Sequence, residues 1–205
     1  MDAQGVIEVL RTMSRRMESE RDFLTELDNR IADGDHGINM ARGFVAVEKL
    51  LSGLADKDIG TILKTVGMTL VSVVGGTAGL LYGTAFLKSG LALAGKAEVF
   101  LDDFLVCLKT SIEGIQQRGH AVRGEKTMLD AMIPALEAMT ATRTDGGDAK
   151  AVFASGVAAA RAGVEYTKTM IATKGRASYI GERSLGHQDP GATSFTFLLE
   201  CVLPS

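Results

Sequence analysis

The sequence predicts an all-α protein, and three observations lead to this prediction. Apolar residues recur in steps of three and four, as in Met40, Phe44, Val47, Leu51 and Leu54, which is the period of an amphipathic helix. No segment shows the sustained alternation of a strand. Aromatic residues make up only 5% of the chain and there is no Trp, so Ala, Leu, Val and Met fill the apolar positions and favour closely packed helices over a β-sandwich.

The same periodicity defines the expected helices in order. Each carries one apolar stripe toward a shared core, and the stripes with the clearest spacing are Val6-Leu10-Met13-Met17, Ile59-Leu63-Val66-Leu70-Val73, Leu101-Leu105-Leu108-Ile112-Ile115 and Leu129-Met132-Leu136-Met139. We expect about eight helices, with a ninth near the C-terminus, over 3–20, 22–32, 37–54, 58–74, 77–95, 98–118, 127–141, 147–173 and 191–203.

Short connections between these ranges predict that neighbouring helices run antiparallel, as a bundle. Asp2 and Asp58 stand where N-cap residues of helices are expected, and Asp148 follows a Gly-Gly break. The longest irregular stretch is 174–190, and long loops in compact domains are often functional. At 205 residues the chain fits one domain over 1–205.

Charge and composition argue against several classes of partner. The net charge is −3 at pH 7 and there is no basic run, so we expect binding neither to nucleic acid nor to an anionic membrane surface. No apolar run approaches the roughly 18 residues that a membrane span needs. The polar N-terminus lacks a signal sequence, and the two cysteines, Cys107 and Cys201, lie in apolar surroundings that suit reduced thiols. We therefore expect a cytoplasmic protein.

An acidic, glycine-containing segment is the most informative part of the chain. Asp28, Asp33 and Asp35 fall within eight residues, with Gly34 and Gly37 between and after them. Three carboxylates so close together repel one another unless a cation neutralises them, and carboxylate oxygens suit Mg²⁺ or Ca²⁺ better than zinc. The leading interpretation is a Mg²⁺-nucleotide site, and the alternative is a solvated acidic turn between two helices.

A second glycine-rich segment, 75–79, reads Gly-Gly-Thr-Ala-Gly immediately before an expected helix. Free backbone N–H groups and the positive end of the helix dipole suit an anion at such a point. A plain helix–helix turn would use the same glycines for close packing. The segment alone therefore leaves both interpretations open.

Other metal and phosphate motifs are excluded. In the segment 119–127 Glu125 separates Gly124 from Lys126, whereas the lysine of a P-loop follows the glycine directly. The segment 33–37 lacks the distal glutamate of an EF-hand, and no Glu-x-x-His pair supports a di-iron bundle. Among the histidines His36 is the strongest candidate for a phosphate contact, because it adjoins two carboxylates and a helix start.

The chain resembles a known family, the nucleotide-binding L subunit of dihydroxyacetone kinase. In single-chain dihydroxyacetone kinases the same unit is the C-terminal domain. The resemblance lies in ordered blocks over most of the chain, namely 27–28, 33–40, the glycines of 75–79, 126–130, 174–184 and 186–192. The last two blocks are long and specific. The resemblance implies an antiparallel α-helical barrel with the nucleotide bound at one end.

The resemblance also implies roles for individual residues. Two Mg²⁺ would be held by Asp28, Asp33 and Asp35. The tightly bound ADP or ATP would contact His36, Gly37, Ile38, Asn39, Thr77, Ala78, Gly119, Met128, Arg176, Asp189, Pro190 and Gly191. Ala78 stands where the family often has serine, so a contact there would come from the backbone.

Charge arithmetic agrees with this assignment and requires no catalytic side chain. Three carboxylates and ADP sum to about −6, and two Mg²⁺ reduce this to about −2, which Arg176 and helix dipoles would offset. Phosphoryl transfer relies mainly on positioning and on metal ions that neutralise charge. We therefore expect no nucleophile and no covalent step from this chain.

The function that the resemblance implies is that of a phosphotransferase subunit in the phosphoenolpyruvate-dependent dihydroxyacetone kinase. Bound ADP would be phosphorylated by a phosphohistidine on an M subunit, and the γ-phosphoryl group would pass to dihydroxyacetone held on a K subunit. A homodimer is left open. Two alternatives remain: an ATP-dependent ketose kinase subunit with exchangeable nucleotide, and a non-enzymatic helical module that senses nucleotide or metal.

Overall fold

Helices make up the regular structure of residues 1–203, which the computed structural model describes. The α-helices are α1 (Ala3–Ser19), α2 (Arg21–Ile31), α3 (His36–Leu51), α4 (Ile59–Val73), α5 (Gly76–Ala92), α6 (Leu101–Gly119), α7 (Leu129–Thr144), α8 (Ala149–Thr167) and α9 (Pro190–Glu200). Two 3₁₀ helices, η1 (Ser52–Leu54) and η2 (Arg176–Ser184), lie between them. The all-α prediction is confirmed, since 1–203 contains no strand beyond an isolated bridge between Asp2 and Glu98.

The structure differs from the sequence prediction at one helix end and in one segment that was expected to be irregular. The helix expected over 147–173 ends at Thr167. The stretch 174–190, expected to be irregular, contains η2, which changes direction at Gly181 because this residue has a φ of 55°. Short helical turns of this kind lack a long apolar periodicity, so spacing alone does not reveal them.

The described chain divides into two compact units. The first consists of residues 1–19 and 39–120, and the second of residues 20–38 and 121–203, so the division falls inside α3. Each unit is described by itself below. A single domain over 1–205 stays a prediction.

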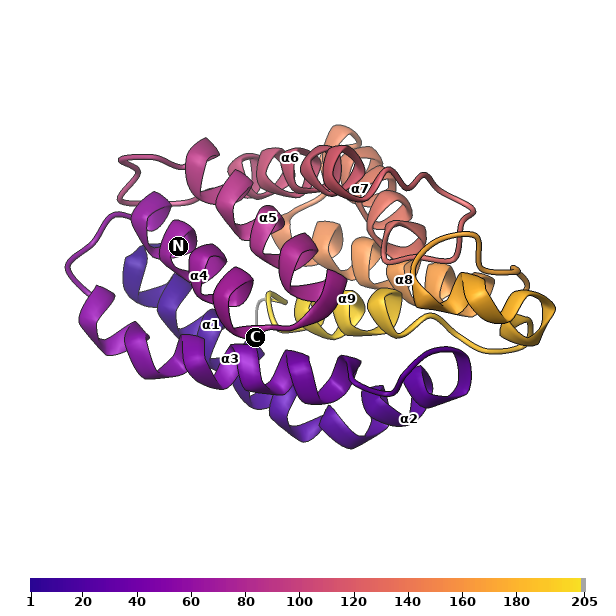
Figure 1. Cartoon of the computed structure of the whole chain (residues 1–205). Helices are drawn as coiled ribbons and strands as arrows, with labels where there is room; N and C mark the ends of the chain where they lie inside the picture. Colours follow the sequence, from indigo (N-terminus) through magenta and orange to yellow (C-terminus); the bar gives the residue numbers. More distant parts are fainter. Residues whose placement is uncertain (204–205) are drawn as a thin grey trace. The chain divides into compact units, whose positions relative to one another are not determined.

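In the first unit α4 and α5 form an antiparallel pair (Figure 1). A Cβ on Gly60, at the start of α4, would lie 2.7 Å from the carbonyl oxygen of Gly90, near the end of α5. A Cβ on Gly67 would likewise lie 2.8 Å from the Gly83 oxygen. Both distances are too short for a side chain, so these glycines allow the two backbones to pack at close range.

The core of the first unit also includes α1, α3 and α6. Phe44 of α3 is fully buried and meets Phe86 of α5 edge-on, with 6.3 Å between ring centroids. The buried Ser14 hydroxyl of α1 donates to the Phe44 carbonyl oxygen at 2.9 Å, which satisfies a polar group that would otherwise be costly to bury. These contacts hold α3 against α1 and α5.

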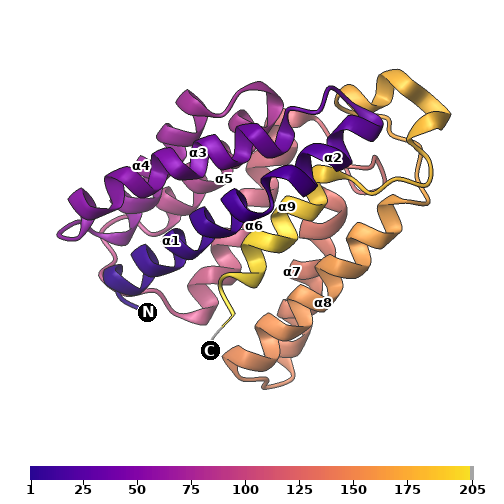
Figure 2. The ribbon, with the colours of Figure 1, turned by 90° about the horizontal axis from the view of Figure 1, so that it is seen from below.

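In the second unit α7 and α8 lie side by side and antiparallel, with α9 against both (Figure 2). A Cβ on Gly163, near the end of α8, would lie 2.2 Å from the carbonyl oxygen of Asp130, near the start of α7. Most of α9 is buried, including Phe195, Leu198 and Leu199. This packing places the start of α9 beside the end of α8, where the candidate site lies.

The expected N-caps are confirmed. The Asp58 carboxylate accepts from Thr61 N at 3.1 Å and the Asp148 carboxylate from Ala151 N at 2.8 Å. A third aspartate, Asp189, caps α9 by accepting from Ala192 N at 2.6 Å. Each carboxylate satisfies a backbone donor that a helix start leaves unpaired. None of the described helices combines the length and apolar character that a membrane span requires.

Candidate functional site

The three carboxylates of the acidic segment converge in the second unit. One carboxylate oxygen from each of Asp28, Asp33 and Asp35 can be chosen so that all three lie within 4.8 Å of one another. Asp28 belongs to the last turn of α2, and the other two lie in the loop between α2 and α3. The structure therefore brings together the three residues that were predicted to hold metal.

Asp28 is the fixed member of this cluster. Its side chain is buried, and its Oδ2 accepts from the backbone N–H groups of Asp35 at 2.9 Å and His36 at 3.2 Å. Asp33 is exposed and Asp35 half-buried. One carboxylate thus shapes the loop while the other two face outward, where a ligand can reach them.

Glycines make this loop possible. Gly34 has a φ of 73°, a conformation that residues with a Cβ rarely adopt. At Gly37 a Cβ would lie 2.0 Å from the Arg21 carbonyl oxygen and 2.5 Å from Thr25 Oγ1. The starts of α2 and α3 can approach each other only because residue 37 has no side chain.

The chemistry of the donors fits hard divalent cations. Carboxylate oxygens are the ligands that Mg²⁺ and Ca²⁺ prefer, and Mg²⁺ in particular is commonly held by one or two carboxylates together with substrate phosphates. Arg176 of η2 forms an ion pair with Asp33. The Arg176 guanidinium therefore lies at the edge of the cluster, within the same unit, as a fixed positive charge suited to a phosphate.

His36 is the first residue of α3 and is buried. Its Nε2 lies 2.9 Å from the hydroxyl oxygen of Ser194 on α9. Burial lowers the pKa of His36 to about 4, so the imidazole is neutral at pH 7. No pattern in the sequence connects His36 with Ser194, because 158 positions separate them.

The turn before α9 lies next to Met128, another predicted nucleotide contact. Asp189, the N-cap of α9, is buried, and burial raises its pKa to about 7. Pro190 is the first residue of α9, where its fixed φ suits a helix start. A Cβ on Gly191 would lie 3.5 Å from Met128 Cβ. Asp189, Gly191 and Met128, all predicted to contact nucleotide, are therefore neighbours.

The remaining predicted contacts lie in the first unit, at the start of α5. Gly75 is the N-cap of α5 and has no side-chain cap, and Gly76 has a φ of 65°. Thr77 and Ala78 occupy the first turn, where backbone N–H groups lack helical partners. A Cβ on Gly75 would lie 3.4 Å from Asn39 Oδ1, so Asn39 lies beside this helix start.

Two other predicted residues lie at element ends. Gly119 is the last residue of α6 and precedes His120, which is left-handed with a φ of 49°. A Cβ on Gly119 would lie 3.5 Å from Leu81 Cδ2 of α5, so Gly119 borders the second turn of α5. Ile38, in the first turn of α3, is 50% exposed.

Sequence reasoning missed the residues that hold these candidates in place. Arg42 donates to Asn39 Oδ1 at 2.8 Å and to the Val73 carbonyl oxygen at 3.1 Å. Lys126 is 1% exposed. The contact of Arg42 could have been predicted, because Asn39 and Arg42 are three residues apart on a helix and therefore lie next to each other on its surface. Nothing in the sequence marks Lys126 as buried.

Comparisons with known proteins give concordant results. The family model of the DAK2 domain matches residues 30–203. The ADP-binding subunit DhaL of the PEP-dependent dihydroxyacetone kinase of Escherichia coli (strain K12) is 42% identical over 184 residues, which are 90% of this chain and 88% of the relative. The corresponding subunit of kinase 2 of Listeria innocua is 42% identical over 205 residues, 99% of this chain and 94% of the relative.

Solved structures show the same fold. The native dihydroxyacetone kinase of C. freundii superimposes with a TM-score of 0.75 at 25% identity, and the match covers 97% of this chain and 34% of that one. A structure of the C. freundii kinase in complex with AMP-PNP and Mg²⁺ gives a TM-score of 0.74 at 24% identity.

Triokinase/FMN cyclase of Homo sapiens is 32% identical over 183 residues, which are 32% of that protein.

Proposed function

Because this chain belongs to the DAK2-domain family, we propose that it is the ADP-binding subunit of a phosphoenolpyruvate-dependent dihydroxyacetone kinase, and hence part of a phosphotransferase. Identity supports the subunit form: the curated DhaL subunits of E. coli and L. innocua kinase 2 are 42% identical to the chain. Larger relatives, of which the chain covers about a third, are 30% to 37% identical.

The observation that carries the proposal is the cluster of Asp28, Asp33 and Asp35, whose ligand oxygens lie within 4.8 Å of one another. An enzyme that binds a diphosphate needs positive charge beside the phosphates. The three carboxylates supply oxygen ligands for the cations that would provide this charge. These three carboxylates would hold the two Mg²⁺, which would supply positive charge that neutralises the phosphates during transfer.

The chain's own groups would bind and orient the nucleotide. The exposed carboxylate of Asp33 and the half-buried carboxylate of Asp35 would face the phosphates through metal, while Asp28 keeps the loop in shape through its two backbone bonds. Arg176, already beside Asp33, would turn its guanidinium fork to a phosphate oxygen. The uncapped N–H groups of Thr77 and Ala78 offer a second set of donors to phosphate.

The neutral, buried His36 would act as a hydrogen-bonding group and not as a charge. Its pKa of about 4 means that the ring is uncharged at neutral pH and keeps one N–H donor and one acceptor nitrogen, and Ser194 fixes its ring orientation. Met128 and the turn 189–191 would border the base and ribose. No side chain is required as a nucleophile in this scheme, because the donor is a phosphohistidine on an M subunit and the acceptor is dihydroxyacetone on a K subunit.

The test is reconstitution with purified K and M subunits, the general phosphoenolpyruvate-dependent carrier proteins, phosphoenolpyruvate and dihydroxyacetone. We expect pyruvate and dihydroxyacetone phosphate to form in equal amounts without added ATP. Formation of product only with ATP, in the absence of phosphoenolpyruvate, would favour an ATP-dependent ketose kinase subunit. Nucleotide binding without transfer to any ketose would indicate a sensing module.

A further inference from the structure

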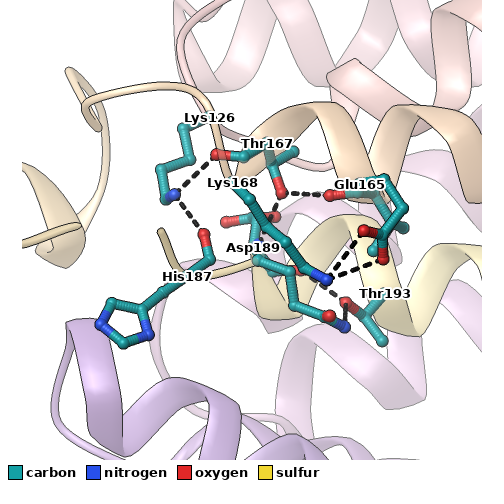
Figure 3. A network of polar contacts seen from close by, with 9 residues as sticks. Lys126, Glu165, Thr167, Lys168, His187, Asp189 and Thr193 are labelled. Atoms are coloured by element: carbon teal, nitrogen blue, oxygen red, sulfur yellow. Dashed lines mark hydrogen bonds and ion pairs between the residues drawn. The ribbon is translucent and has the colours of Figure 1, made fainter. Parts of the chain in front are cut away.

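Lys126 is a buried cation for which the proposed function has no use. Its side chain is 1% exposed, and its Nζ donates to the carbonyl oxygens of Thr167 at 2.7 Å, of Met170 at 3.3 Å, and of His187. An ammonium group has three donors, so all three are occupied by backbone oxygens. Figure 3 shows the ammonium between the Thr167 and His187 carbonyls.

These acceptors belong to two segments that are distant in sequence. Thr167 is the last residue of α8, where a positive charge is favourable, and Met170 lies three residues beyond it. His187 lies in the turn before α9. The ammonium therefore ties the end of α8 to residues 186–189, and two further bonds reinforce the tie: Gly186 N donates to Lys168 O at 2.8 Å and Asp189 N to Thr167 Oγ1 at 2.9 Å.

The backbone at Lys126 is itself constrained. Its φ is 59°, in the left-handed region that costs a residue with a side chain about 1–2 kcal/mol. The buried carboxylate of Asp130 holds the segment in this shape by accepting from Gly124 N at 2.5 Å and Thr127 N at 2.8 Å. Such strain persists where the surroundings over-determine it, and it is concentrated at functional sites.

The position of Lys126 connects it with two predicted nucleotide contacts. Met128 follows it by two residues, and Gly191 lies against Met128, since a Cβ at residue 191 would come within 3.5 Å of Met128 Cβ. The turn 187–191 is thus held on one side by the Lys126 ammonium and on the other by contact with Met128. Charge attraction also links the ammonium to Asp189, the N-cap of α9.

We propose that Lys126 is a positioning residue of the nucleotide site, whose ammonium group fixes the turn 187–191 against Met128 before nucleotide arrives. This rests on the proposed function. It assigns Lys126 no contact with nucleotide or metal. The lysine acts through the turn, by supplying in one buried group the donors that two backbone segments need in order to stay together.

The test compares Lys126→Met with wild type and with two controls. Lys126→Met keeps most of the side-chain volume and removes the donors. Lys168→Met removes a lysine from the same helix end that instead pairs with Glu165 at 2.8 Å. Met139→Ala creates a cavity at a fully buried position of α7, and thus lowers stability without touching the turn.

Two quantities are measured at a temperature where all variants are folded. The first is hydrogen exchange in nucleotide-free protein: we expect the amides of Gly186 and Asp189 to exchange at least about tenfold faster in Lys126→Met only. The second is the Kd for ADP in the presence of Mg²⁺, which we expect to rise about tenfold or more in Lys126→Met, comparable to the loss when a group behind a ligand is removed. Lys168→Met and Met139→Ala should match wild type in both.

Should Lys126→Met fail to fold, Thr167→Val provides the second test, because it removes the hydroxyl that accepts from Asp189 N and that also donates to the Val164 carbonyl oxygen within α8. We expect the same two changes with smaller size. Unchanged exchange at Asp189, or a Kd that rises equally in Met139→Ala, would overturn the inference. If wild type binds no ADP, the proposed function fails, and the exchange measurement still decides whether Lys126 holds the turn.

Discussion

Replacing Asp35 with asparagine separates the ligand role of the acidic cluster from its structural role. The Asp35 carboxylate accepts no hydrogen bond and forms no ion pair within residues 1–203, whereas Asp28 holds two backbone donors and Asp33 pairs with Arg176. Asparagine keeps the shape of the side chain and removes its charge. The substitution therefore changes the electrostatics of the site and leaves the loop intact.

Asp35→Asn should raise the stability of the metal-free protein and lower its affinity for Mg²⁺ with ADP. Two unit charges at the 4.8 Å that bounds the cluster repel by about 1 kcal/mol at the dielectric constant of water and by about 3.5 kcal/mol at an effective value of 20. We therefore expect Asp35→Asn to stabilise the metal-free protein by about 1–3 kcal/mol. Affinity for Mg²⁺ with ADP should fall by about 100-fold or more, since loss of a direct ligand should exceed the 10–100-fold typical of groups behind ligands.

Calorimetric unfolding in EDTA and titration of ADP with Mg²⁺ measure these two effects. Asp56→Asn serves as the control, because Asp56 is an exposed carboxylate that forms an ion pair with its neighbour Lys57. It should change neither quantity appreciably. An unaltered Kd for ADP in Asp35→Asn, or a loss of stability in EDTA, would refute the assignment of the cluster as a metal site.

Three further predictions concern other parts of the site. Arg176→Lys keeps the charge but loses the planar fork, and the reconstituted transfer rate should fall about tenfold or more with the fold retained, as judged by circular dichroism. Asp189→Asn should keep the cap of α9 and remove a titrating group. In wild type, burial raises the pKa of Asp189 from 3.8 to about 7, so between these pH values the native state binds a proton that the unfolded state releases. Wild-type stability should therefore fall by up to about 1.4 kcal/mol per pH unit between about pH 4 and 7. Urea unfolding without metal or nucleotide should show that slope lessened in the variant; an equal slope would contradict it. Gly37→Ala should destabilise by about 1–3 kcal/mol through overpacking, since its Cβ would lie 2.0 Å from Arg21 O, whereas Gly53→Ala, with open space around it, should not; equal unfolding midpoints would contradict this.

The helices were accessible from the sequence because burial on one face imposes a period that can be counted. In the predicted stripe Met40, Phe44, Val47, Leu51 and Leu54, the first four residues are completely buried, as their spacing predicted, whereas Leu54 lies in η1 and is half-buried. The element η2 escaped because a 3₁₀ turn of nine residues with a left-handed Gly181 has no such period. Its presence turns an expected loop into a shaped segment that carries Arg176.

Local charge density made the acidic cluster visible, because Asp28, Asp33 and Asp35 are close in sequence as well as in space. The groups that hold the site were not visible for the opposite reason. Ser194 reaches His36 across 158 positions, and Lys126 reaches His187 across 61. Lysine is also expected to be exposed. Lys126 is buried because three backbone carbonyl oxygens accept from its ammonium group, and the sequence does not show this arrangement.

We propose that the cluster of Asp28, Asp33 and Asp35 binds a nucleotide diphosphate through divalent ions. Native mass spectrometry of the purified protein tests it most directly. We expect a bound mass equal to ADP plus two magnesium ions in wild type, and its loss in Asp35→Asn and after EDTA treatment. A wild-type protein that carries no added mass after incubation with ADP and Mg²⁺, or ADP that stays bound in EDTA, would contradict the account.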